Sequence, residues 1–362
     1  MRFVVFLFLL LSGLPLTAAA EEFGADNVLE ERLFLNNSYV PNYRELMRDT
    51  IVAVSDFARE ARPGFKIIVE EGRDLISLGQ WEIDLNELHR AEMEGATTDD
   101  ERFLLKLFSP DDKITVGMPN RRYLQAIDGV FFKDRFCGKN ALPADTKKLL
   151  DNAGVTVFGV EHCDTAEKKA EAQQKAAKEK TALHADTDKK EAFASTGEDK
   201  QLFLENPNGT EHLNDVRNVL IMTNNQAYSS KGEWVDALAA TNYDMIAIDP
   251  FFRFNRPLSA QDVQRLKYKK LGSKRLVFAV LNLSVAEDTR LYWDLTWKLK
   301  SPYWLRFPTE GNEAGITVDY WNTEWKKILG VYFKEIVSLG YDGVYLTGLD
   351  AHKIFERIVL IN

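Results

Sequence analysis

Acidic side chains at the ends of strand-like runs are the first candidates for chemistry in this sequence. Six carboxylates follow apolar runs directly or within a few residues: Glu70, Glu71, Asp134, Glu161, Asp249 and Asp350. A retaining glycosidase needs two carboxyl groups about 5–5.5 Å apart and an inverting one about 6.5–9.5 Å, and barrel strand ends supply either separation. Acidic residues at such places are also common helix caps and turn formers. For any single carboxylate, a structural role is at least as well supported as catalysis.

Aromatic residues concentrate in the segment 285–325. Five of the seven tryptophans lie there with three tyrosines: Trp293, Trp297, Trp304, Trp321, Trp325, Tyr292, Tyr303 and Tyr320. Two interpretations are open in equal measure. The rings pack as core under long loops, or some of them form a platform for the apolar faces of sugar rings. The candidates for such a platform are Trp293, Trp304, Tyr320 and Trp321.

The elements that must position these residues follow a repeating order. Strand-like runs alternate with amphipathic helix-like stretches, and we find eight such runs: 65–72, 126–132, 154–162, 181–186, 216–224, 243–250, 274–284 and 341–348. Apolar residues recur at helical spacing most clearly over 323–340. Eight strands alternating with helices predict an α/β fold, a single all-parallel (β/α)8 TIM barrel. A doubly wound open sheet is the alternative.

The amino-terminal end and one internal stretch depart from this pattern. Residues 1–20 combine a positive start, an apolar run and small residues, which predicts a signal peptide. Residues 21–40 are expected to be a loosely ordered lead-in, and the barrel is expected to occupy 41–362. Within it, residues 187–215 are rich in charged and small polar side chains, so we expect an exposed connection with little core of its own.

The apolar run of the signal is too short for a confident membrane span. We therefore expect an exported chain, periplasmic or extracellular, with no stable span after cleavage; an uncleaved anchor is the less favoured alternative. A net charge of −9 argues against nucleic acid as a partner. The two cysteines, Cys137 and Cys163, form either a disulfide or two buried thiols. The five histidines are scattered without ligand-like spacing and no phosphate-binding loop is present, so we expect neither a metal site nor a cofactor.

Four segments carry a resemblance to a known family: "ATNYDMIAIDPFF", "KRLVFAVLNLSVAEDTRLYW", "VDYWNTEWKKI" and "GYDGVYLTGLDAH". Together they resemble the glycoside hydrolase family 114 barrel, the endo-α-1,4-polygalactosaminidase-like family. The resemblance covers nearly the whole chain after the signal. It implies a TIM barrel and, as a partner, a polysaccharide or oligosaccharide such as an amino-sugar-rich polymer.

The order of the segments differs from most relatives in that family. "FAREARPGFKIIVEEG" and "YLQAIDGVFFKDRFCG" resemble segments that usually follow the "DGVYL" strand, but here they lie near the amino terminus. The resemblance therefore implies a circular permutation. Helix 42–60 would complete the βα unit of the strand at 343–347, and the connection 187–215 would join the old ends. Barrel termini that lie close in space make such a rearrangement inexpensive.

The resemblance also places the family's catalytic residues. Its usual "DGVYLD" ends here in Thr347, at the position of the presumed nucleophile, and Lys133 stands at the position of the presumed acid/base glutamate. Both carboxylates are replaced. A threonine hydroxyl is a poor nucleophile without an activating base, and a lysine does not do a carboxyl group's acid/base work unless burial lowers its pKa. Residues that do match the family pattern are Asp134, Asp249, Glu287, Arg290 and Asp350.

Two functions follow from these departures. The first is an exported glycoside hydrolase family 114-like barrel that binds an amino-sugar glycan or an envelope partner with impaired hydrolysis. Glu287, Arg290 and Asp350, with the four aromatic residues named above, would bind the ligand. The second is an active glycosidase with relocated carboxylates, in which Glu70 and Glu71 act with Asp249 or Asp134.

Overall fold

The computed structural model describes residues 40–95, 115–187, 196 and 202–358. Eight parallel strands form one sheet in this part of the chain, one for each strand-like run expected from the sequence. They are β1 (Lys66–Glu70), β2 (Gly129–Lys133), β3 (Thr156–His162), β4 (Leu183–Asp186), β5 (Val219–Met222), β6 (Met245–Ile248), β9 (Leu276–Asn282) and β13 (Gly343–Thr347).

The sheet curls into a nearly closed barrel, compatible with a TIM-like fold. Its order is β4-β3-β2-β1-β13-β9-β6-β5, so the first and last strands of the chain pair directly with each other. Between β4 and β5 the described residues form no ladder. Instead, the Ile221 N–H donates to Nδ1 of His184 at 3.2 Å. Burial lowers the pKa of His184 to about 4, so this ring is neutral near pH 7 and its nitrogen is free to accept the bond.

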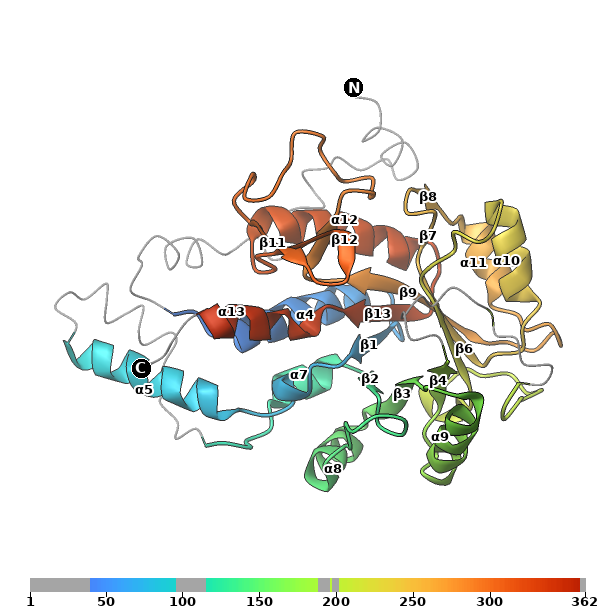
Figure 1. Ribbon diagram of the computed structural model, residues 1–362, viewed down its shortest axis with the longest axis horizontal. Helices are drawn as coiled ribbons and strands as arrows, with labels where there is room; N and C mark the ends of the chain where they lie inside the picture. Colours follow the sequence, from blue (N-terminus) through green and yellow to red (C-terminus); the bar gives the residue numbers. More distant parts are fainter. Residues whose placement is uncertain (1–39, 96–114, 188–195, 197–201, 359–362) are drawn as a thin grey trace.

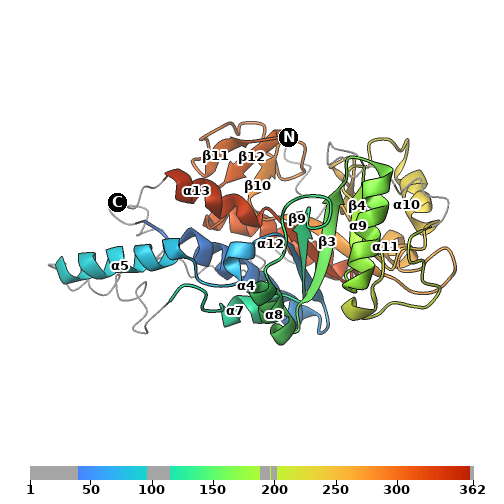
Figure 2. The same ribbon diagram turned by 60° about the horizontal axis from the view of Figure 1, so that its bottom comes forward.

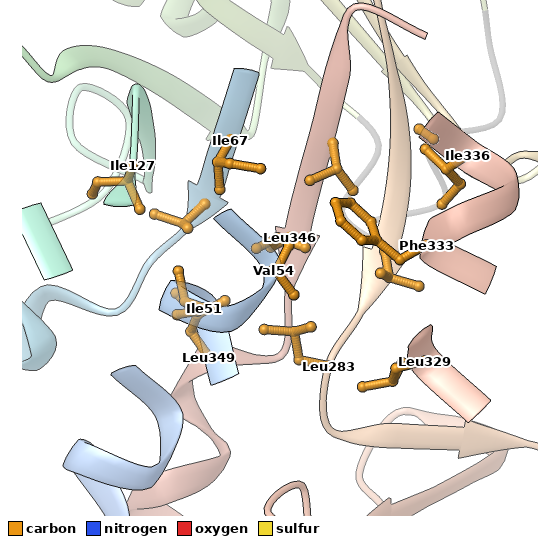
Figure 3. Close-up of a cluster of buried hydrophobic side chains, with 14 of the residues drawn as sticks. Ile51, Val54, Ile67, Ile127, Leu283, Leu329, Phe333, Ile336, Leu346 and Leu349 are labelled. Carbon is orange, nitrogen blue, oxygen red and sulfur yellow. The ribbon is translucent and has the colours of Figure 1, made fainter. Parts of the chain in front are cut away.

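Alternation along the strands separates two cores. One face of each strand points into the barrel, where Phe131, Phe158 and Tyr345 pack together. The other face points toward the helices. Figure 3 shows this outer core, in which Leu346 of β13 lies against Val54. Strands buried on both faces explain the nearly continuous apolar runs in the sequence.

Helices surround the barrel (Figures 1 and 2). In chain order they are α4 (Tyr43–Ala61), α5 (Gln80–Gly95), α7 (Arg121–Ala126), α8 (Ala144–Ala153), α9 (Ala166–Lys178), α10 (Lys231–Ala239), α11 (Ala260–Leu266), α12 (Thr323–Ser338) and α13 (His352–Ile358). Side-chain caps start several of them. Asn42 accepts from the Glu45 N–H at the start of α4, and Gly154, with φ 73°, ends α8 in the left-handed conformation.

The two ends of the described chain meet on one side of the barrel. In Figures 1 and 2, α4 and α13 run side by side. Arg44 of α4 pairs with Glu356 of α13 through two hydrogen bonds of 2.7 and 3.0 Å. Helix α4 therefore packs beside the carboxyl-terminal strand, as expected. The residues expected to form a signal peptide, and most of those expected to form the lead-in, lie outside the described residues.

Helix α5 extends away from the barrel in both views and is anchored at its start. There the Arg48 guanidinium, from α4, pairs with the Glu82 carboxylate at 2.5 Å, and both side chains are 1% exposed. Arg48 also donates to the carbonyl oxygen of Leu75 at 2.9 Å.

Two small antiparallel sheets were not expected from the sequence. Strands β10 (Val285–Glu287), β12 (Asn312–Val318) and β11 (Leu305–Thr309) form one after β9, and β7 (Phe251–Phe252) and β8 (Arg256–Pro257) form the other after β6. Three short 3-10 helices complete the fold: η1 (Arg73–Leu75), η2 (Leu213–Asp215) and η3 (Leu349–Ala351). The aromatic segment therefore carries a sheet of its own over the barrel mouth.

The connection before β5 is better anchored than its composition suggests. Asn206 and Thr210 both donate to Oδ1 of the buried Asp244, at 3.1 and 2.9 Å. Lys269 joins the same carboxylate at 2.5 Å with its own side chain fully buried. The second half of 187–215 is thus fixed by a buried polar network, because its polar side chains find partners inside the protein.

Candidate functional site

Glu70 is the centre of a polar cluster where three strands end. Its Oε1 lies 3.0 Å from Nζ of Lys133 on β2, and its Oε2 accepts a 2.6 Å hydrogen bond from the Tyr345 hydroxyl on β13. Strand β1 lies between the other two, and the side chains of all three residues share the barrel-facing side of their strands. These carboxyl ends are where parallel barrels place chemistry.

Thr347 is the last residue of β13, two positions after Tyr345 and on the same face. The pairing of Val69 with Leu346 places it alongside Glu70. In the part of the chain that the structure describes, its hydroxyl has no hydrogen-bond partner, and the residue is half-buried. The Thr347 hydroxyl is therefore available to a ligand in the mouth. It lies between the Glu70 carboxylate, which already has partners, and Asn282, the residue with which Thr347 pairs on β9.

Glu71 and Asp134 hold the turns after β1 and β2. Both have left-handed backbones, with φ of 60° and 53°. Glu71 accepts from the Lys133 N–H at 2.5 Å, and Asp134 accepts from the His162 N–H at 3.1 Å. Burial raises the pKa of Glu71, the Lys133 hydrogen bond opposes this, and the charge of Asp350 adds to it. Both carboxylates have internal donors, which supports the structural side of the two interpretations.

Glu161 at the end of β3 is fully buried and receives three backbone donors. The N–H groups of Arg135, Phe136 and Cys137 lie 2.9–3.0 Å from its two oxygens. Burial raises the pKa of Glu161, while these three hydrogen bonds lower it. The same loop is tied down by a disulfide between Cys137 and Cys163. Of the two states left open for these cysteines, the structure has the bonded one.

Asp249, Arg290 and Glu287 form a second charged cluster beside the first. Asp249, at the end of β6, is buried and lies 2.9 Å from Nη1 of Arg290. The Nε of Arg290 lies 2.5 Å from Oε2 of Glu287. Burial works against the charge of Arg290, but the two carboxylates outweigh it and raise its pKa. Glu287 and Arg290 line a cavity of about 50 Å³ with Tyr332 and Trp325.

Asp350 lies in η3, just beyond β13. Its Oδ1 is 3.0 Å from Nζ of Lys353, which also reaches Asp74 at 3.1 Å. Asp350 therefore ties the loop after β13 to η1. Its side chain is 43% exposed, so it also remains open to a ligand at the rim.

Three of the four platform candidates are core residues. Trp304 and Tyr320 are fully buried and Trp321 is 6% exposed. Trp304 donates its Nε1 hydrogen to Glu324 at 2.7 Å, and the Tyr320 hydroxyl donates to the Tyr43 carbonyl at 2.6 Å. Only Trp293 is half-buried; it packs edge-on against Trp297, with ring centroids 5.5 Å apart. For the three buried residues, core packing is the better interpretation, because no ligand reaches their faces.

Tyr345 is the member of the site that sequence reasoning missed. It stands within an apolar run, where a tyrosine passes for core. The signal that could have found it is strand alternation, since it lies two residues before Thr347 and therefore on the same face. His162 was missed in the same way; its Nδ1 lies 3.4 Å from Oδ1 of Asp134.

Another cavity lies away from this mouth. It measures about 510 Å³ and lies at the amino ends of β4 and β5, lined by residues such as Thr181, Asn206 and Arg217. In the described ranges, no group of three His, Cys, Asp or Glu side chains is arranged to hold a metal ion. No helix there is both long and apolar enough to cross a membrane.

Comparisons with known proteins give partial matches. No family model matches the chain. An uncharacterized protein of Methanocaldococcus jannaschii is 32% identical over 168 residues, 43% of this chain and 47% of that protein. Uncharacterized proteins of Deinococcus radiodurans and Thermotoga maritima are 27% identical over 119 residues and 34% identical over 79. These cover 33% and 22% of this chain, and 37% and 24% of those proteins. The chain thus spans less than half the length of each.

Proposed function

We propose that this protein is an exported, glycoside hydrolase family 114-like barrel that binds an amino-sugar glycan, with ordinary two-carboxylate hydrolysis impaired. One observation carries the proposal. At the barrel mouth, the two positions at which the family keeps its presumed carboxylates hold Thr347 and Lys133, and Lys133 is paired with the neighbouring Glu70 at 3.0 Å. An ion-paired lysine is a poor general acid for a glycosidic oxygen, and an unactivated threonine is a poor nucleophile.

The charge of the mouth supports a cationic or neutral sugar. Glu70, Glu71, Asp134, Asp249 and Glu287 all lie at or beside the strand ends, together with the cations Lys133, Arg290 and Arg73. This excess of carboxylates favours ligands with amino groups. The hydroxyl of Thr347 and the rim carboxylate of Asp350 are placed to receive hydrogen bonds from a sugar.

The second candidate, an active glycosidase with relocated carboxylates, has one favourable observation. Glu70 points into the barrel and sits beside the nucleophile position. Against it, each proposed partner is engaged: Asp249 by Arg290, and Asp134 by the His162 N–H. A general acid must be free to hold and release a proton, so these contacts weigh against catalysis without a rearrangement.

The order of the elements supports a circular permutation. The seam between β4 and β5 coincides with the connection 187–215, where the old ends would be joined, and the present ends meet through Arg44 and Glu356. Matches to relatives that cover less than half of the chain are expected of a permuted order, because an alignment in chain order follows only one part. A chain that begins at 202, joins 358 to 40 by a short linker and ends at 187 should fold into the same barrel.

The disulfide between Cys137 and Cys163 supports export, because such bonds persist in oxidising compartments. Periplasmic or extracellular location is part of this proposal. Fractionation of cells that express the full chain tests this location. The mature chain should appear outside the cytoplasm, with the signal removed and with no free thiol.

Binding and turnover are tested together on purified chain. Oligosaccharides of α-1,4-linked galactosamine are titrated by calorimetry, and products are followed by mass spectrometry. We expect millimolar or tighter binding without turnover. Thr347→Arg should abolish binding by filling the mouth, whereas Ser338→Arg, at the exposed far end of α12, should not. Turnover that disappears in Glu70→Gln/Glu71→Gln would overturn the binding-only proposal in favour of relocated carboxylates.

A further inference from the structure

An amine, a carboxylate and a phenol form one chain of polar contacts at the barrel mouth, an ion pair followed by a hydrogen bond. Lys133 Nζ lies 3.0 Å from Glu70 Oε1, and the Tyr345 hydroxyl lies 2.6 Å from Glu70 Oε2. Exposure falls along this chain: the side chain of Lys133 is 27% exposed and that of Glu70 is 13%, while Tyr345 is 1% exposed. The amine is thus the member that faces the open mouth, and the phenol holds the carboxylate from inside.

This cluster differs from the lysine pairs on the protein's surface. Lys147 pairs with Asp151 within α8, and Lys168 of α9 pairs with Asp164 just before that helix; all four side chains are 44–55% exposed. Lys133 and Glu70 instead sit on two paired strands whose geometry is fixed by the ladder. An exposed ion pair stays in contact with water, whereas a partly buried pair loses part of its hydration, and this loss costs free energy. A partly buried pair at a barrel mouth therefore contributes little to the stability of the fold.

We propose that Lys133 is a nucleophilic amine that forms an imine with an aldehyde or ketone, with Glu70 as its proton shuttle. Lysine amines form such covalent intermediates with carbonyl compounds when a neighbouring group removes and returns the proton. Tyr345 is a positioning residue, because it touches Glu70 and not the reacting atoms. This activity goes beyond glycan binding and does not depend on it.

The reaction balances with the groups present. Glu70 takes one proton from the Lys133 ammonium, and the free amine attacks the carbonyl carbon. A nitrogen–carbon bond forms while the carbonyl π pair moves to oxygen. Transfer of a proton from nitrogen to that oxygen gives a carbinolamine. The carbon–oxygen bond then breaks as Glu70 returns its proton, and water leaves. The net change is ammonium plus carbonyl to protonated imine plus water, without oxidant or reductant.

The surroundings point to a small hydroxylated carbonyl compound as the ligand class. The Thr347 hydroxyl lies beside Glu70 without a partner in the described part of the chain, so it is available to a ligand hydroxyl. Asn282, on the next strand, adds an amide at the same level. An open-chain sugar end carries both an aldehyde and adjacent hydroxyls, which matches an amine flanked by hydrogen-bonding groups.

Reductive trapping tests the proposal on the intact mature chain. Glycolaldehyde is added with cyanoborohydride, which reduces an imine to a stable amine, and peptide mass spectrometry follows the mass gain at each lysine. Lys147 and Lys168 serve as internal controls, since each has a carboxylate partner at 2.7–2.8 Å but lies outside the barrel. We expect Lys133 to be modified at least tenfold faster than either control.

Variants of Glu70 and Tyr345 distinguish proton transfer by Glu70 from a reactivity of Lys133 that depends only on its exposure. Glu70→Gln should reduce the rate at Lys133 to that of the controls, and Glu70→Asp should restore part of it. Tyr345→Phe should shift the pH profile of trapping at Lys133 alone, because it frees the carboxylate. Circular dichroism verifies that each variant is folded.

A rate at Lys133 no higher than at Lys147 and Lys168 would overturn the proposal. A folded Glu70→Gln variant that reacts as fast as the wild type would overturn the role of Glu70. Because the probe is a small aldehyde and not a glycan, failure of trapping leaves the proposed glycan binding intact, and failure of glycan binding leaves trapping intact.

Discussion

Asp319 is a buried carboxylate whose ionisation should weaken the fold. It follows β12, its side chain is 8% exposed, and among the described residues its Oδ1 accepts no hydrogen bond. The nearest cation is Nε of Arg306, 3.5 Å away on a side chain that is 44% exposed. Burial raises the pKa of Asp319 to about 7, against a smaller opposing effect of Arg306. The folded protein therefore favours the protonated form.

The sign and size of the effect follow from this difference. In the unfolded chain the carboxyl group ionises near pH 3.8, so the folded form holds its proton more tightly. The contribution of the protonated group is fully present below pH 3.8 and is lost as pH rises through about 7. A difference of about 3 pH units corresponds to at most about 4 kcal/mol. Solvent relaxation around the site should reduce it to a fraction of that limit.

Asp319→Asn removes the ionisation and keeps the shape. The free energy of unfolding is measured by urea titration with tryptophan fluorescence between pH 4.5 and 8, with the disulfide intact. The stability advantage of the variant over the wild type should be small at pH 4.5 and should grow by about 1 kcal/mol or more between pH 4.5 and 8. Asp145→Asn, on the exposed start of α8, is the matched control. A difference independent of pH, or a wild type that is the more stable at pH 8, would refute the reasoning.

Three further outcomes follow from buried or cross-linked groups. Arg48→Met leaves the Glu82 carboxylate buried without its cation, so the free energy of unfolding should fall by about 3–5 kcal/mol, and Arg48→Met/Glu82→Leu should recover most of the loss. Reducing the disulfide, which spans 26 residues, should cost about 3.5 kcal/mol by the loop-entropy relation; dithiothreitol should not affect Cys137→Ser/Cys163→Ser. Protonation of His184 as pH falls from 6.5 to about 4 removes the acceptor of the Ile221 amide. Hydrogen exchange at that amide should therefore accelerate in acid relative to exchange at Leu220, whereas an unchanged ratio would contradict the seam contact.

Most of the eight strands were predictable because they are buried on both faces and bounded by polar or turn residues, so their apolar runs are visible without any partner; β4 is shorter and half-buried at its end. The sheet β10-β12-β11 was not, because β11 and the first half of β12 hold mostly exposed and half-buried residues, and β12 gains its pairing only from β10 and β11. The burial of Trp304 and Tyr320 could not be predicted either. The sequence does not show whether a tryptophan in a loop-like segment faces a sugar or, as Trp304 does, the side chain of Glu324.

The positions of several site residues at strand ends could be predicted from the sequence, whereas their contacts depend on how the strands pair. Glu70, Thr347 and Lys133 could be placed at strand ends from the runs that precede them. Their mutual contacts could not, because β1 and β2 are separated by a long excursion and β13 lies at the other end of the chain. Tyr345 joined the site only when β1 and β13 were seen to pair, which places its hydroxyl on Glu70.

The seam between β4 and β5 differs from every other strand boundary of this barrel. Seven strand boundaries are joined by backbone ladders that respond little to solution conditions, whereas at the eighth the described residues form no ladder and the His184 imidazole accepts a hydrogen bond from the Ile221 amide. Acidity therefore acts at one defined line along the wall and not on the wall as a whole. In acid the barrel should open first between β4 and β5. The mouth built on β2, β1 and β13, on the opposite side, should keep its shape.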